Sequence, residues 1–212
     1  MNEHKLLVEL GAELVELRLD YIVRTVNLKR LIGERPGPVV VTCRRQKDGG
    51  KWNGEEEARL TLLRSAIAAE VDYVDLEDDI AAEIPRYGKT KRIISLHDFE
   101  KTPKDIEAIH ARLCELDPDI VKLATLANNP HDNLRMMQLV AQSEVPTIGI
   151  CMGEMGTPTR ILGAKYGSPL TFCTYNRDRV MAPGQLSFQQ MREEYNYDSV
   201  GPDTEIYGVI AD

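Results

Sequence analysis

Residues 91–124, KRIISLHDFEKTPKDIEAIHARLCELDPDIVKLA, contain one strand–helix–strand unit. Two short apolar runs, at 91–96 and 119–124, flank a stretch of helical period at 103–116. That stretch begins with Thr102-Pro103 and has an acidic first turn, both of which favour a helix start. Two such runs joined by a helix predict parallel neighbouring strands. The unit therefore predicts an α/β fold built on a parallel sheet.

The same alternation extends in both directions along the chain. Further apolar runs lie at 13–19, 38–43, 72–77, 146–152 and 170–175. Further helical stretches lie near 2–11, 25–33, 54–70, 79–87, 130–142, 157–166 and 187–195. About seven such units fit a (β/α) barrel better than a doubly wound sheet, and no Gly-rich phosphate fingerprint follows the first run. We predict one barrel domain over residues 1–200.

The composition excludes several classes of function. The chain has 212 residues and a formal net charge of −8, which argues against binding to nucleic acid or to an anionic membrane surface. No apolar stretch approaches the ~18 residues of a spanning helix, and no signal-peptide run is evident. The cysteines form no CxxC pair, so we expect a reduced, cytoplasmic compartment. They are Cys43, Cys114, Cys151 and Cys173.

Charged residues interrupt strands that a parallel sheet would bury on both faces. Glu16 and Arg18 share one face of the first run, and Asp75 and Glu77 share one face of the third. In a barrel, the C-terminal strand ends form the catalytic mouth. These four residues fit a site there, but a structural ion-pair ring is an equal alternative. Lys122, within an apolar run, fits an amine nucleophile for a ketone, because burial disfavours its charged form.

Four more residues are candidates for the same mouth. Arg44 and His97 end their own runs; a strand-end cap or core histidine is the alternative for His97. Arg160 can clamp a carboxylate with its planar fork, unless it is a solvated helix residue. Gln185 lies in a Pro-Gly turn that could cover the mouth or simply be exposed. No His, Asp and Cys spacing predicts a metal site.

Taken in order, these segments resemble type I 3-dehydroquinate dehydratase over nearly the whole chain. The matching segments are Glu16-Leu-Arg18-Leu-Asp20, Arg44 with Asp48-Gly49-Gly50, Asp75-Leu-Glu77, Ser95-Leu-His97-Asp98-Phe99, Asp119-Ile-Val-Lys122, Met152-Gly153 with Arg160, and Ala182-Pro183-Gly184-Gln185. Each motif alone is weak, but together they are specific.

The resemblance implies dehydration of 3-dehydroquinate to 3-dehydroshikimate, in the shikimate pathway, on a (β/α)8 TIM barrel without metal or organic cofactor. It implies Lys122 as the Schiff-base lysine, His97 as the general acid/base and Asp48 as the acidic residue that supports His97. It further implies substrate binding by Glu16, Arg18, Arg44, Arg160 and Gln185. We also expect a homodimer.

The chain departs from the family pattern in its site and at its ends. Asp48 stands where the family usually has Glu, Met181 stands where it usually has Ser, and the loop from Arg160 to Gln185 is about two residues longer. The usual first barrel strand is missing. Residues 201–212 resemble the first strand of a shikimate dehydrogenase, so the chain could be the dehydratase part of a dehydratase–shikimate dehydrogenase fusion.

Two other functions fit part of the pattern. Another class I Schiff-base lyase, such as an aldolase, would use Lys122 to cleave a carbon–carbon bond. His97, Arg160 and Gln185 argue against it, because this set suits a carboxylated cyclic polyol. A non-catalytic metabolite sensor on the same barrel would be favoured by loss of Lys122 or His97, and both residues are present.

Overall fold

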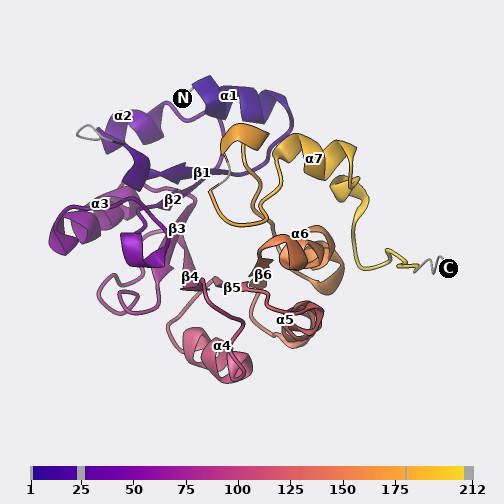
Figure 1. Ribbon diagram of the computed structural model, residues 1–212. Coiled ribbons are helices and arrows are strands. Elements are labelled where there is room, and N and C mark those ends of the chain that lie inside the picture. The colour runs from indigo at the N-terminus through magenta and orange to yellow at the C-terminus, as the bar shows by residue number, and fades with distance from the viewer. Residues whose placement is uncertain (1, 23–26, 180, 208–212) are drawn as a thin grey trace. The chain divides into compact units, whose positions relative to one another are not determined.

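The computed structural model describes residues 2–22, 27–179 and 181–207 (Figure 1). Its strands form one six-stranded sheet in the order β1-β2-β3-β4-β5-β6. They are β1 (Val15–Arg18), β2 (Val39–Thr42), β3 (Tyr73–Glu77), β4 (Lys91–Asp98), β5 (Ile120–Leu126) and β6 (Thr147–Met152). The pairs β1–β2, β2–β3 and β3–β4 are parallel. The predicted α/β class with a parallel sheet is confirmed.

Helices alternate with the strands except between β3 and β4. They are α1 (Asn2–Glu9), α2 (Leu28–Gly33), α3 (Glu56–Ala68), α4 (Ile106–Cys114), α5 (Pro130–Gln142), α6 (Thr157–Leu162) and α7 (Phe188–Glu193). The predicted start of α2, near residue 25, lies outside the described residues. No helix in the described ranges is long and apolar enough to cross a membrane.

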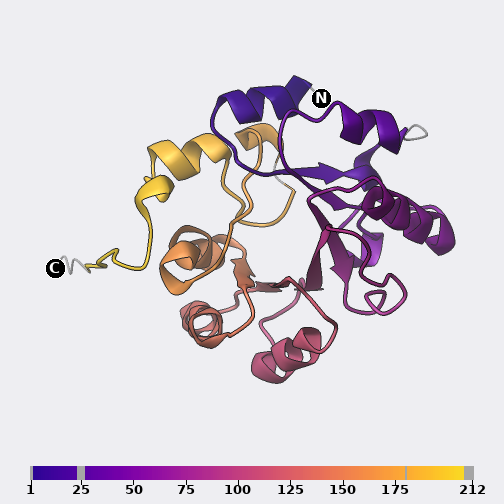
Figure 2. The same cartoon turned by 180° about the vertical axis from the view of Figure 1, so that it is seen from behind.

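The chain divides into two compact units. The first comprises Met1–Asp98 with Pro103–Ala124, and the second comprises Phe99–Thr102 with Thr125–Asp212. In the first unit, α3 packs on β2 and β3, as both views show (Figure 1 and Figure 2). Every residue of β2 is buried, and α3 buries Leu60, Leu63, Ala66 and Ile67. This packing fixes the strand ends from which the polar side chains project.

In the second unit, β6 is tied closely to the helices beside it. A Cβ on Gly149 would lie 2.5 Å from Val140 Cγ2, so glycine is needed where α5 approaches the strand. Thr159 Oγ1, in α6, accepts a hydrogen bond of 2.8 Å from Cys151 N. These contacts fix α6, which carries Arg160, against the end of β6.

Two predicted elements are wrong. The run at 170–175 forms no strand, because its one ladder contact is an isolated bridge between Thr174 and Ser187. The stretch at 79–87 forms no helix. Its bonds at Ile80 and Glu83 span three residues, and Pro85 disfavours helical backbone in the residue before it. Of the C-terminal segment, residues 201–207 form turns and irregular backbone, and residues 208–212 lie outside the described part.

Candidate active site

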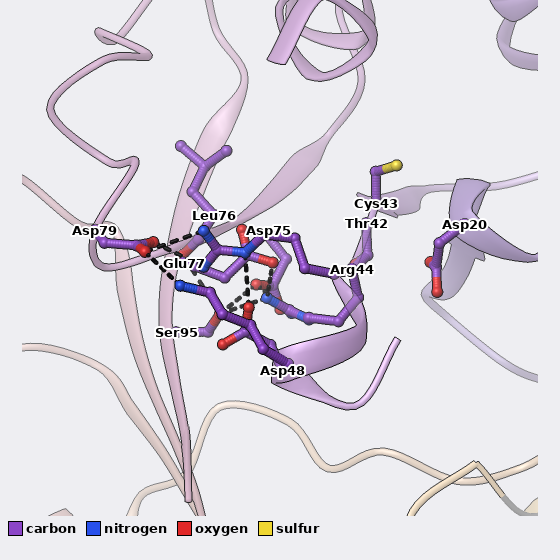
Figure 3. Close-up of polar contacts among 12 residues, drawn as sticks. Asp20, Thr42, Cys43, Arg44, Asp48, Asp75, Leu76, Glu77, Asp79 and Ser95 are labelled. Atoms are coloured by element: carbon purple, nitrogen blue, oxygen red, sulfur yellow. Dashed lines mark hydrogen bonds and ion pairs between the residues drawn. The ribbon is translucent and has the colours of Figure 1, made fainter. Parts of the chain in front are cut away.

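Asp75 is the centre of a buried charge cluster in the first unit. Its carboxylate accepts hydrogen bonds from Arg44 Nη2 at 2.6 Å and Ser95 Oγ at 2.6 Å (Figure 3), and from Lys122 Nζ at 2.9 Å. Burial alone would raise the pKa of Asp75, but Arg44, Lys122, His97 and the Ser95 hydroxyl hold it well below its usual range. Asp75 is therefore a fixed negative charge beside the lysine.

Lys122 lies on β5 and is only 6% exposed. The sequence placed this lysine within an apolar run, and the structure adds a partner that the sequence did not show: its ammonium is paired with Asp75. The neighbouring side chains Val121 and Leu123 are buried in the core. A short ionic hydrogen bond to Asp75 thus holds the amine between these apolar neighbours.

Arg44 follows β2 and connects two carboxylates. Its Nη1 lies 2.9 Å from Glu77 Oε1, while its Nη2 binds Asp75. Although burial lowers the pKa of an arginine, these two carboxylates raise that of Arg44 above its usual value. Gly50 folds back onto it: a Cβ there would lie 2.0 Å from Arg44 O. The Gly-Gly motif of the sequence therefore serves to fold the loop tightly around Arg44.

His97 lies near the end of β4 and is half-buried. Burial, and then the positive charges of Arg44 and Lys122, lower the pKa of His97 well below its usual value, with Asp75 opposing them. The imidazole is therefore neutral at neutral pH, which suits a general base.

Arg59 is a member of the cluster that the sequence analysis missed. Its side chain, on α3, is fully buried, and its Nη1 donates to Glu77 Oε2 at 2.9 Å. A signal was present in the sequence. Arg59 lies four residues before Leu63 and seven before Ala66, which places it on the buried stripe of the helix.

Three other predicted residues of the first unit have defined polar partners. Glu16 Oε1 accepts a hydrogen bond of 2.7 Å from Thr42 Oγ1. Arg18 forms a fork of 2.9 and 2.8 Å with Asp20. Asp48 Oδ2 accepts from Arg45 Nε at 2.7 Å, and its support of His97 stays a prediction.

Arg160 belongs to the second unit and differs from these charges. It is 2% exposed, and its Nη2 donates to Pro183 O at 3.2 Å. Within the described part of the chain, its Nε has no hydrogen-bond partner and its guanidinium has no carboxylate partner. Burial lowers the pKa of Arg160 to about 10, with Cys173 and Cys151 opposing the shift. This side chain could bind an anion such as a substrate carboxylate.

Gln185 closes a tight turn in the same unit. Its Oε1 accepts from Met181 N at 3.1 Å, and Gly184 adopts φ +68°. A Cβ on Gly184 would lie 2.2 Å from Gly153 O, so the turn sits directly on the residue that follows β6. The Pro-Gly segment is thus an ordered turn whose Pro183 O accepts from both Gly153 N and Arg160 Nη2.

A lysine buried beside a carboxylate and a histidine, all three on strands of one sheet, is the arrangement of an α/β enzyme with a nucleophilic lysine. A family model described as type I 3-dehydroquinase matches residues 1–202. The chain therefore belongs to the type I 3-dehydroquinase family, as the resemblance predicted. The predicted enzyme class, 3-dehydroquinate dehydratase, follows from this membership.

Individual relatives agree with the family. A 3-dehydroquinate dehydratase from Methanopyrus kandleri is 37% identical over 192 residues, which cover 88% of this chain and 87% of that protein. The chloroplastic bifunctional 3-dehydroquinate dehydratase/shikimate dehydrogenase of Arabidopsis thaliana is 39% identical over 95% of this chain, which spans only 35% of that protein. A solved type I 3-dehydroquinate dehydratase from Clostridium difficile, with covalently modified comenic acid, is 28% identical. It matches with a TM-score of 0.81 over 94% of this chain and 87% of that one.

Proposed function

We propose that the chain dehydrates 3-dehydroquinate to 3-dehydroshikimate through a Schiff base on Lys122. The observation that carries this proposal is the buried pair of Lys122 Nζ and Asp75 Oδ2, 2.9 Å apart, in a member of the type I family. The amine of Lys122 adds to the C3 ketone, and water leaves to form the imine. Asp75, whose pKa lies well below its usual range, stays ionised and stabilises the protonated imine.

His97 then moves the proton that the elimination requires. Its neutral imidazole takes a proton from C2, and the imine accepts the electron pair as an enamine. The imidazolium so formed, beside Arg44, is a strong acid because its pKa is lowered. It gives the proton to the C1 hydroxyl, which leaves as water, and hydrolysis of the imine releases the product and regenerates Lys122.

The remaining predicted residues bind the substrate in this proposal. Arg160 holds the substrate carboxylate, since its buried guanidinium lacks a carboxylate partner in the described residues. Glu16, Arg18 and the Gln185 amide bind ring hydroxyls. Arg44, predicted as a substrate-binding residue, is occupied by Asp75, Glu77 and Ser95. We therefore assign it to holding Asp75 as well.

The enone of 3-dehydroshikimate gives a direct test. Mixing the protein with 3-dehydroquinate should produce the rising absorbance of a conjugated enone, and the variant Lys122→Ala should produce none. Both proteins are to be checked for the same circular dichroism, so that loss of fold is not mistaken for loss of chemistry. Turnover by folded Lys122→Ala at the wild-type rate would refute the assignment.

We further propose a barrel type, a fusion partner and an oligomeric state for the chain. The similarity to the Clostridium difficile structure supports a (β/α)8 barrel. The partial match to the bifunctional Arabidopsis protein supports a fusion in which residues 201–212 belong to a shikimate dehydrogenase domain; of these, residues 201–207 form turns and irregular backbone. A homodimer in the cytoplasm, without nucleic acid as a partner, completes the proposal. Light scattering of the purified chain tests the dimer.

A further inference from the structure

Arg59 is a buried arginine to which the proposed reaction assigns no direct role. Its side chain is 0% exposed. Its Nη1 donates to Cys43 O at 2.6 Å as well as to Glu77, and its Nε and Nη2 form a fork on Glu56 at 2.9 and 2.6 Å. Burying a charge so completely is costly unless every hydrogen bond is satisfied. Four hydrogen bonds and two carboxylates compensate most of this cost, and one of these carboxylates, Glu77, also pairs with Arg44.

The charges alternate from Lys122 to Arg59 in an unbroken row. Lys122 pairs with Asp75 at 2.9 Å, and Asp75 with Arg44 at 2.6 Å. Arg44 pairs with Glu77 at 2.9 Å, and Glu77 with Arg59 at 2.9 Å. Figure 3 shows Arg44 lying among Asp75, Glu77 and Ser95. Loss of the Arg59 charge would therefore alter the pairing of Glu77, then of Arg44 and Asp75, and so the surroundings of Lys122.

A count of these charges shows what Arg59 contributes. With Lys122 as an uncharged amine, the buried cations Arg44 and Arg59 balance the buried anions Asp75 and Glu77. Glu56, the second partner of Arg59, is 45% exposed, so water screens its charge and it is left out of this balance. Without Arg59, one buried cation faces two buried anions, and in a low-dielectric interior such an excess of negative charge is costly unless a neighbouring cation compensates it.

We propose that Arg59 is a positioning residue for the lysine chemistry. By holding Glu77, it keeps Arg44 on Asp75 and keeps the buried cluster neutral when Lys122 is an uncharged amine. The inference rests on the proposed function, in which Lys122 attacks the substrate. The charged and titratable groups of the first unit near Lys122 are Asp75 from β3, Arg44 from the end of β2 and His97 from β4.

The test is the pH profile of kcat/KM for Arg59→Met and Arg59→Lys. Arg59→Met removes the charge, so kcat should fall about tenfold or more, because a misplacement of about 1 Å in a reacting group can cost up to ~10²-fold. Its acid limb should move to higher pH by roughly half a unit to one unit. KM should change little, because Arg59 does not contact the substrate. Arg59→Lys keeps the charge, so its acid limb should stay at the wild-type position.

Arg92 provides a matched control. It is also a buried arginine of the first unit, but its hydrogen bonds go to Ala81 O and Asp117. Arg92→Met should lose stability while its acid limb stays in place. If Arg59→Met does not fold, the pH profile of Glu77→Gln tests the proposal instead. It removes a negative charge from the same row, so its acid limb should move to lower pH.

The outcomes separate this inference from the proposed function. Borohydride should trap substrate on Lys122 in the wild-type chain; if it does not, both the proposed function and the role of Arg59 fall. If Lys122 is trapped but the acid limb of folded Arg59→Met coincides with that of wild type, only the role of Arg59 is refuted. An unmoved limb in Glu77→Gln would refute it in the same way.

Discussion

Two sets of buried charges in this chain are held in opposite ways. In the first unit, Asp75 has three donors, Arg44 has two carboxylates and Arg59 has two. In the second unit, Arg160 is just as deeply buried, yet its one described hydrogen bond goes to a backbone carbonyl. Each charge of the first set thus has an oppositely charged partner, whereas Arg160 has no carboxylate partner among the described residues.

This difference matches the roles proposed above, in which the first set maintains the site and Arg160 binds the substrate carboxylate. A fully paired buried ion stabilises its partners, and removing it leaves them uncompensated. An unpaired buried ion costs folding free energy and is retained where binding recovers that cost. The two sets should therefore respond in opposite directions to loss of charge.

The largest effect on stability is expected for Arg44→Met. This substitution leaves Asp75 and Glu77 without their shared cation, which should lower the free energy of unfolding by about 3–5 kcal/mol. Activity should be lost with it. Urea denaturation followed through Trp52, the chain's single tryptophan, measures the change. A denaturation midpoint equal to that of wild type would show that the cluster does not need this pairing.

Replacing His97 should separate chemistry from stability within the same unit. His97→Ala removes a neutral side chain, so no buried charge is left uncompensated. We expect kcat to fall at least ~10²-fold, as for other general acid/base residues. Borohydride trapping on Lys122 should persist, because imine formation does not require the C2 proton transfer. A near wild-type kcat would require another base, and Glu77 would be the first to examine.

Arg160→Met should give the opposite pattern to Arg44→Met. Loss of a charge-assisted carboxylate contact should weaken substrate binding about 10- to 100-fold. The folded chain should gain stability, by about 1 kcal/mol, because an unpaired buried charge is replaced by an apolar side chain. Calorimetry of substrate binding and urea denaturation measure the two effects. A less stable Arg160→Met would mean that the guanidinium serves the fold.

The smallest expected effect concerns His4, a buried side chain that must be neutral. In the described structure neither of its ring nitrogens has a hydrogen-bond partner. Burial, and then the positive charges of the N-terminus and Arg35, lower its pKa. The folded pKa of His4 lies below the unfolded value of about 6.5, so the unfolded chain binds a proton more readily. The folded chain is therefore most stable above about pH 6.5, and it loses stability as the pH falls from there through the folded pKa.

Comparison of wild type with His4→Leu isolates this term. Between pH 8 and pH 5 the wild-type chain should lose more stability than the variant does, by roughly 1 kcal/mol. His97, whose pKa is also lowered, contributes with the same sign to both chains and cancels in the difference. Equal losses in the two proteins would show that His4 stays neutral or finds a partner on protonation.

Six of the seven predicted strands form, and each of them overlaps a short apolar run of the sequence. The seventh, at 170–175, failed because apolar content does not reveal whether a ladder partner is available. The helix predicted at 79–87 does not form. Pro85 is visible in the sequence and disfavours helical backbone in the residue before it, so this end of the prediction was avoidable.

Most of the site was visible as polar residues on apolar strands, but the pairings were not. Strand alternation placed Asp75 and Glu77 on one face. It does not predict that Asp75 pairs with Lys122 while Glu77 pairs with Arg59. That choice depends on how side chains from β3, β5 and α3 meet in the folded unit. The comparison of Arg44 with Arg160 likewise required the structure, since the sequence does not show which carboxylates either guanidinium meets.

The central claim, that Lys122 is the amine that binds substrate, has one direct measurement. Borohydride added during turnover of 3-dehydroquinate should reduce the imine to a stable secondary amine. Peptide mass spectrometry should then find the adduct on the peptide that contains Lys122, and Lys122→Ala should carry none. An unmodified Lys122, or an adduct on Lys5 or Lys165 in its place, would contradict the account.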